Sequence, residues 1–207
     1  MVSASIAPLF QPIQLGSLTL RNRIFMSALT RNRAVPTNSP NSVMLEHYRK
    51  RATSAGLIIT EGVLITPQGS EWPHVSGIWN KEEVAGWKNI TDAVHKEGSH
   101  IFAQLWHLGQ VSHPDAPEQK EAGIPVYAPS AISARGGKFR FLSGQPGYVI
   151  PTAIDDPAEL LDLFEKAATN AKEAGFDGVE LHGANGYLIH QFLDSTSDAR
   201  QDSWEVQ

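Results

Sequence analysis

The chain contains no cysteine among its 207 residues, so disulfide bonds, cysteine nucleophiles and thiolate metal sites are excluded. It also lacks an apolar run approaching the ~18 residues of a membrane helix. The N-terminal stretch MVSASIAPLF has neither the positive start nor the long apolar segment of a signal peptide. We therefore expect a cytoplasmic protein with no membrane partner.

Positive charge is scarce, with 17 Lys and Arg against 22 Asp and Glu and a formal net charge of -5. Because surfaces that bind phosphate are usually basic, nucleic acid is not an expected partner. The eight histidines show no HExxH or similar spacing, so no metal site is predicted. The length suits a single domain over residues 1–207 with a sizeable core.

Apolar, β-branched runs alternate with helical patterns along the chain. Strands that alternate with helices imply right-handed crossovers and a parallel sheet, so the sequence predicts an α/β fold of about four strand–helix units. The expected elements are a hairpin at 10–23, strands at 24–30, 57–65, 101–107 and 178–182, and helices at 42–56 (Ser42 as N-cap, Gly56 as C′), 81–98, 156–175 and 185–193.

Residues 111–154 interrupt this alternation, because they are rich in Gly, Pro and Ser and carry few helix signals. A structureless loop of that length is unusual in a compact domain unless it covers an active site. We interpret it as a lid-like excursion after the third strand, in which APSAI and YVIPTAI pair as a small hairpin.

Polar side chains occur at several of the predicted strand ends, where parallel α/β folds place their function. A buried parallel strand is normally apolar throughout, so converging polar groups indicate a pocket. The strand ends in order are Ala28-Leu29-Thr30, Thr60-Glu61-Gly62, Gln104 to His107, and His182 to Asn185.

The last strand end is the most informative. His182 and Asn185 can point two donors at one oxygen, and Tyr187 presents a phenol at the start of a helix. Such a set can polarise a carbonyl and deliver a proton beside it. An equally open interpretation is that His182 and Asn185 cap the helix and Tyr187 packs. Trp106 flanks Gln104 and is the tryptophan most closely associated with the pocket.

Four long motifs extend this pattern: LFQPIQLGSLTLRNRIFMSALTRNRA, LIITEGVLITPQG, FAQLWHLG and HGANGYLIHQFL. With these motifs in order, the chain resembles the old yellow enzyme family of flavin-dependent alkene reductases, closest to its fungal and plant branch, from Leu9 to Asp202. The resemblance implies a TIM (β/α)8-barrel type of fold with FMN across the C-terminal ends of its strands. It also implies NADPH or NADH as hydride donor and an electron-poor alkene, such as an α,β-unsaturated carbonyl or nitro compound, as substrate.

The resemblance also implies a role for each matching residue. His182 and Asn185 match the pair that binds the substrate oxygen, Tyr187 matches the proton donor, and Trp106 matches a pocket wall. Five further residues match positions that contact the flavin: Ala28, Leu29, Thr30, Gly62 and Gln104.

The chain is short for this fold, since a TIM barrel has roughly 250 residues. After Asp202, Ser203 to Gln207 replace the Gly-Gly-Ser turn of the family. We therefore expect only the first half of a barrel, without the anchor for the FMN phosphate. The competing hypothesis is a non-catalytic fragment that binds no flavin by itself. The unpaired edges of a half-barrel predict self-association or the need for a complementing fragment.

Overall fold

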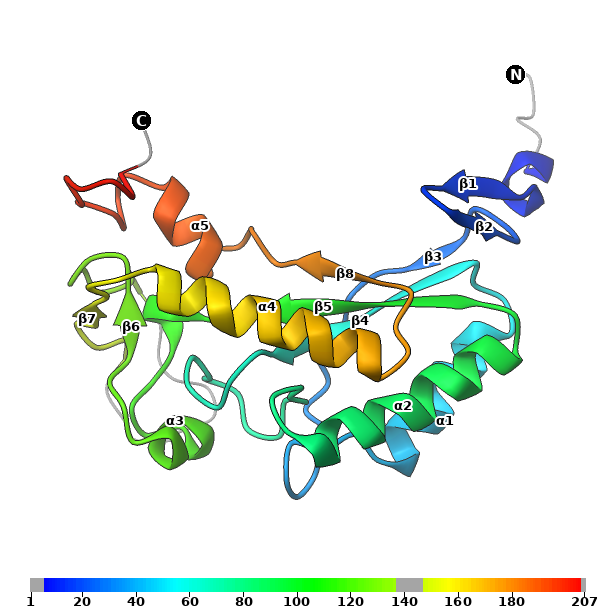
Figure 1. The fold of residues 1–207 in the computed structure, drawn as a ribbon, viewed down its shortest axis with the longest axis horizontal. Coiled ribbons are helices and arrows are strands. Elements are labelled where there is room, and N and C mark those ends of the chain that lie inside the picture. Colours follow the sequence, from blue (N-terminus) through cyan, green and yellow to red (C-terminus); the bar gives the residue numbers. More distant parts are fainter. Residues whose placement is uncertain (1–5, 137–146, 206–207) are drawn as a thin grey trace.

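The structure, a computed structural model, describes residues 6–136 and 147–205. At its centre is a four-stranded sheet in the order β3-β4-β5-β8, in which all neighbouring strands are parallel (Figure 1). The expected α/β architecture is therefore confirmed. Within the described ranges, β3 and β8 are the outer strands of this sheet. The strands are β3 (Phe25–Met26), β4 (Leu57–Leu64), β5 (His100–Trp106) and β8 (Gly178–Leu181).

Helices connect the successive strands of the sheet. Figure 1 shows α1 and α2 side by side below the sheet and α4 running across β5. A short α5 follows β8 and leads to the C-terminal end of the chain. The helices are α1 (Ser42–Ala52), α2 (Lys81–Lys96), α4 (Ala158–Glu173) and α5 (Leu188–Leu193).

The N-terminal hairpin is confirmed, after a short 3-10 helix η1 (Ala7–Phe10). Strands β1 (Ile13–Leu15) and β2 (Leu18–Leu20) pair antiparallel, and Gly16 between them has φ 57°. Arg21 then ties the hairpin to the helices, because its guanidinium donates to the carbonyl oxygens of Ala55 (3.0 Å) and Glu97 (2.8 Å) just beyond α1 and α2. A cation at helix C-terminal ends is favoured by the helix dipole.

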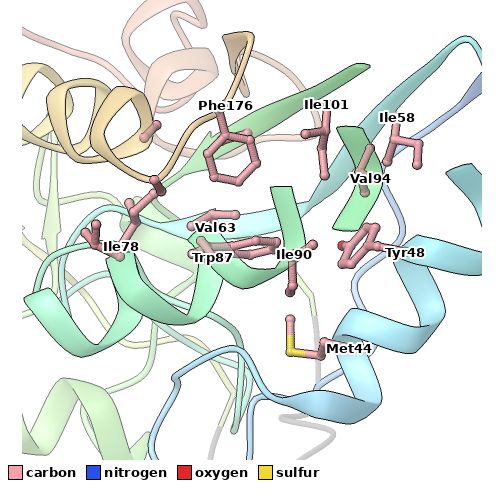
Figure 2. Close-up of a cluster of buried hydrophobic side chains, with 14 of the residues drawn as sticks. Met44, Tyr48, Ile58, Val63, Ile78, Trp87, Ile90, Val94, Ile101 and Phe176 are labelled. Atoms are coloured by element: carbon pink, nitrogen blue, oxygen red, sulfur yellow. The ribbon is translucent and has the colours of Figure 1, made fainter. Parts of the chain in front are cut away.

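The main core lies between the sheet and the helices α1, α2 and α4. Trp87 on α2 is fully buried near its centre, where it meets Tyr48 and Phe176 at ring-centroid distances of 5.9 and 5.3 Å (Figure 2). Its indole N–H donates to the carbonyl oxygen of Gly77 at 3.0 Å, which satisfies the polar atom that burial would otherwise isolate. Ile58 and Ile101 contribute the strand side of the same core.

The predicted ends of the 42–56 helix are wrong. Asn41 is the N-cap, since its side chain accepts from the backbone N–H groups of Val43 and Met44. The helix ends at Ala52, and Gly56 is outside the left-handed region. A Cβ at Gly56 would lie 2.4 Å from the carbonyl oxygen of Asn22, so close approach of two backbones explains this glycine.

Two other elements are shorter than expected. The 24–30 strand is reduced to Phe25–Met26, and the 185–193 helix begins only at Leu188. The second difference has a local cause, because Asn185 and Gly186 have φ values of 58° and 74°, outside the helical region.

The hairpin expected within 111–154 is wrong in its direction. The two segments do pair, through β6 (Tyr127–Ala128) and β7 (Thr152–Ala153), but the strands are parallel. An apolar pattern predicts that a segment pairs without specifying the direction, which depends on the course of the connecting chain. The segment also contains the end of a 3-10 helix, η2 (Gly109–Val111), and a helix that the sequence reading missed, α3 (Pro117–Ala122). Part of the predicted lid, residues 137–146, lies outside the described residues.

Candidate active site

A cavity of about 550 Å³ lies beside the C-terminal ends of β5 and β8 and the segment that follows β3. Volumes of this size are typical of small-molecule sites. Eight of the nine predicted site residues line it: Ala28, Leu29, Thr30, Gln104, Trp106, His182, Asn185 and Tyr187. The tertiary structure therefore brings together segments that are some 150 residues apart in the sequence.

The register of β5 and β8 arranges four cavity side chains as two pairs. Gln104 lies directly opposite Glu180, and two residues later follow Trp106 at the end of β5 and His182 immediately after β8. Because side chains alternate along a strand, residues two apart share a face. The rings of Trp106 and His182 are stacked, with centroids 6.2 Å apart and an interplanar angle of 21°. The cavity thus has a polar end at Gln104 and Glu180 and an aromatic end beyond them.

Tyr187 completes the aromatic end. Its ring stands edge-on to Trp106 at 4.9 Å and to His182 at 4.8 Å between centroids. The ring of Trp72 is also edge-on to that of Trp106, with centroids 6.1 Å apart. Edge-to-face packing of this kind holds aromatic rings in defined orientations. The phenol of Tyr187 and the imidazole of His182 are therefore held beside one another at the aromatic end of the cavity.

His182 is a neutral imidazole at physiological pH, because partial burial lowers its pKa, an effect that the charge of Glu180 offsets in part. Its Nδ1 accepts a hydrogen bond from the backbone N–H of Ala184 at 3.4 Å. In a neutral ring with an accepting Nδ1, the proton resides on Nε2. His182 can therefore donate from Nε2 to an oxygen in the cavity.

The turn from Gly183 to Gly186 places Asn185 and Tyr187. Asn185 is in the left-handed region, which asparagine tolerates better than most residues. Tyr187, not His182 or Asn185, occupies the N-cap position of α5, and its side chain makes no capping hydrogen bond. The interpretation that His182 and Asn185 cap this helix is therefore wrong.

Gln191 holds this turn from behind and was not identified from the sequence. Its side chain is fully buried and donates to the carbonyl oxygens of Leu108 (2.9 Å) and Gly186 (2.7 Å). Its Oε1 accepts from the backbone N–H of Gln110 at 3.0 Å. A single amide thus connects α5, the 183–186 turn and the segment after β5.

Gly62 is the predicted site residue that does not line the cavity. A Cβ there would lie 2.3 Å from Cε3 of Trp106, so the glycine makes room for the indole. The register of β4 against β5 shifts between Ile59 and Gly62, which is where the side-chain alternation of β4 changes. The prediction that Gly62 contacts a flavin stays a prediction.

A buried polar network lies behind the segment that carries Thr30. The Glu61 carboxylate is fully buried and accepts from Arg31 at 3.1 Å and from the Tyr48 hydroxyl at 2.9 Å. The Tyr48 oxygen in turn accepts from the backbone N–H of Glu61 at 3.0 Å. This network connects α1, β4 and the chain after β3, and so fixes the cavity wall next to Thr30.

Other residues of the strand ends have structural roles or were missed. His107 is buried outside the cavity, where desolvation lowers its pKa to about 4 and its Nδ1 accepts from Gly109 N–H at 3.0 Å. Glu180 lines the cavity but was not identified, although its position two residues before His182 on one strand was an available signal.

The ranges 6–136 and 147–205 contain no cluster of three His, Asp or Glu side chains able to hold a metal ion. Nor does any helix in these ranges have the length and apolarity to cross a bilayer.

Comparison with known proteins gives matches along almost the whole chain. Residues 8–205 match the NADH:flavin oxidoreductase / NADH oxidase family. The chain is 43% identical over 202 residues to the NADP-dependent oxidoreductase lnbE of Aspergillus flavus, a match that covers 96% of this chain and 50% of that protein. It is 41% identical over 208 residues to a probable flavin mononucleotide-dependent alkene reductase of Leishmania infantum, with 98% and 56% covered.

Among solved structures, the old yellow enzyme homologue from Zymomonas mobilis superimposes with a TM-score of 0.87 at 43% identity. That match covers 96% of this chain and 55% of the solved chain. The chain thus spans about half the length of the relatives it matches.

Proposed function

We propose that the cavity is part of an FMN-dependent alkene reductase site, because the chain belongs to the NADH:flavin oxidoreductase / NADH oxidase family. The solved structures that it resembles include an old yellow enzyme homologue. The hydride donor is NADPH or NADH, and the substrate is an α,β-unsaturated carbonyl or nitro compound. The observation that carries this proposal is the packing of Tyr187 against His182 at one end of a cavity whose other end carries Gln104.

The residues at the cavity fit a flat heterocycle with a polar edge. Gln104 supplies an amide and Thr30 a hydroxyl, while Trp72 and Trp106 supply apolar walls. We assign Ala28 and Leu29, which neighbour Thr30, to backbone contacts with FMN, and Gly62 to the indirect task of seating Trp106. Bound FMN would supply the hydride that is added to one carbon of the alkene.

The residues of the aromatic end perform the other half of the reduction. The Nε2–H of His182 and the amide of Asn185 donate to the carbonyl or nitro oxygen, which stabilises the negative charge that develops there. Tyr187 gives its proton to the α-carbon. A phenol with an ordinary pKa of about 10 is a weak acid, and it suffices because the carbon that it meets is strongly basic.

We further propose that residues 1–207 act as one domain of a TIM-barrel type, with 111–154 as a lid-like excursion from the alternating strands and helices. The similarity to old yellow enzyme structures over 96% of the chain supports this assignment. Because the chain spans about half of its relatives, a second candidate function is a fragment that retains the fold but does not bind flavin by itself.

The two candidates differ in a visible property. The purified chain is mixed with FMN, freed of unbound flavin and examined for visible absorbance, then reduced anaerobically with NADPH and given 2-cyclohexen-1-one. Retained flavin that NADPH bleaches and the enone reoxidises supports the reductase. A colourless protein after incubation with FMN supports the fragment.

The role of Tyr187 is tested by Tyr187→Phe in the flavin-loaded protein. We expect enone reduction to slow by about 10²-fold or more while bleaching by NADPH is unchanged, because only the proton transfer is removed. Tyr127→Phe, on β6, is the matched control and should leave both steps unchanged. Equal rates of enone reduction in Tyr187→Phe and wild type would contradict the assignment.

A further inference from the structure

We propose that Glu180 is a positioning residue that orients the side-chain amide of Gln104, so that this end of the cavity recognises a ligand edge with a C=O next to an N–H. The inference rests on the proposed function for the identity of the ligand. Its geometric part depends only on the residues of this chain.

The contact between the two side chains is short and is set by the sheet. Gln104 and Glu180 are paired in the register of β5 and β8, and Nε2 of Gln104 donates to Oε1 of Glu180 at 2.5 Å. A hydrogen bond from an N–H to a carboxylate is stronger than one between neutral groups. Gln104 is 9% exposed, so its amide has little access to water as an alternative partner.

This hydrogen bond decides which way the amide faces. An ionised carboxylate only accepts hydrogen bonds, whereas the glutamine amide has a donating and an accepting end. The NH2 group must therefore face Glu180, because the opposite orientation would bring the carbonyl oxygen against a negative charge. The backbone of Gln104 is held as well, since its N–H donates to the Thr60 hydroxyl at 3.0 Å.

An amide oriented in this way has a second N–H and a carbonyl oxygen with which to meet a ligand. Together they match the edge of a lactam or imide, in which a C=O stands beside an N–H. The pyrimidine end of a flavin has such an edge. A ligand without the N–H would leave the Gln104 oxygen unpaired in a largely buried position, and sites of this kind discriminate strongly.

Glu180 is exposed and lies on β8, the outer strand of the sheet. Its carboxylate nevertheless lines the same cavity as Gln104 and His182 and accepts from Gln104 instead of being paired with water alone. Burial lowers the pKa of His182, and the negative charge of Glu180 offsets part of that lowering. Glu180 therefore belongs to the polar end of the cavity with Gln104, and its charge also acts on His182.

The positioning is tested first without any ligand, by NMR of the ¹⁵N-labelled chain. The side-chain NH2 signals of Gln104 are assigned by their loss in Gln104→Leu. In Glu180→Leu we expect these signals to shift and to exchange faster with water, and in Glu180→Gln, which keeps an accepting oxygen, to change less. Glu173→Leu, at an exposed carboxylate on α4, is the control and should leave them in place. Unchanged Gln104 signals in Glu180→Leu would overturn the proposal.

Recognition is tested by titration with FMN and with FMN methylated at N3, which lacks the N–H. We expect wild type to prefer FMN by about tenfold and Glu180→Leu to lose most of that preference. A preference that survives in Glu180→Leu would contradict the recognition role. If wild type binds neither flavin, the proposed function fails for this chain, while the NMR comparison still decides whether Glu180 orients Gln104.

Discussion

The ring of Tyr187 stands edge-on to the imidazole of His182, with centroids 4.8 Å apart and an interplanar angle of 85°. The two groups come from different elements, since His182 directly follows β8 and Tyr187 begins α5. Between them the chain passes through Asn185 and Gly186 in left-handed conformations. The relation of proton donor to oxygen binder therefore depends on a turn of four residues and on what supports that turn.

Gln191 is the first test of that support. Gln191→Leu removes two hydrogen bonds to carbonyl oxygens and one from a backbone N–H, all near the 183–186 turn. We expect it to lower the free energy of unfolding by about 1–3 kcal/mol, because the buried partners are left unpaired. Urea denaturation measures the loss, and hydrogen exchange should show a less protected turn.

The neighbouring residue on α5 provides the control for Gln191→Leu. His190 is 42% exposed in its side chain and pairs only with Asp194, at 3.7 Å, among its described salt bridges. His190→Leu should change the free energy of unfolding by less than about 0.5 kcal/mol. Equal losses in the two variants would mean that the hydrogen bonds of Gln191 do not stabilise the turn.

Gly62 gives a second test, because its missing side chain leaves space for Trp106. Gly62→Ala places a Cβ 2.3 Å from the indole, and we expect a loss of about 1–3 kcal/mol as the ring is displaced. Near-ultraviolet circular dichroism should report the displaced tryptophan. The matched control is Gly183→Ala, whose Cβ meets Ile189 at an ordinary 3.5 Å. An unchanged near-ultraviolet signal of Trp106 in Gly62→Ala would show that the backbone of β4 shifts and the indole keeps its position.

Glu83 makes stability depend on pH. Its side chain completes the capping box of α2, and burial raises its pKa from 4.5 to about 8. A raised pKa in the folded state means that folding favours the protonated acid. The resulting stabilisation is complete below pH 4.5, decreases as the pH rises above that value, and is lost as the pH passes about 8.

Glu83→Gln keeps an accepting oxygen for the N–H groups of Trp79 and Asn80 and cannot ionise. Relative to wild type, we expect its free energy of unfolding to increase between about pH 5 and about pH 8.5, as measured by urea denaturation at several pH values. Glu159→Gln, at an exposed acid in the first turn of α4, should show no such trend. A difference that is constant with pH would contradict the assignment to Glu83.

The outer strand β8 predicts self-association of the isolated chain. Val179 and Leu181 on this strand are 38% and 56% exposed, and exposed apolar strand edges promote pairing with another chain. Sedimentation velocity should show an average mass that rises with concentration. Leu181→Lys should reduce that rise, because a charge at an edge disfavours pairing. A monomer at all concentrations would show that this edge is protected.

Much of the fold was accessible from local patterns. The apolar runs at 57–65 and 101–107 became β4 and β5 almost unchanged, because buried parallel strands need continuous apolar residues. The acidic start and basic end of α2 likewise marked its position. Helix ends were less accessible. Asn41 rather than Ser42 caps α1, since two adjacent residues both have capping side chains and only the backbone path selects between them.

The sequence by itself determined the order of strands and helices, the family, and which side chains stand at strand ends, because these follow from local periodicity and long motifs. It did not reveal the parallel pairing of β6 with β7, the contact between Gln104 and Glu180, or the support of the turn by Gln191. The residues paired in the cited contacts are 25 to 83 positions apart in the sequence. Only the folded chain brings such residues within hydrogen-bonding distance, and register and burial then decide which polar groups pair.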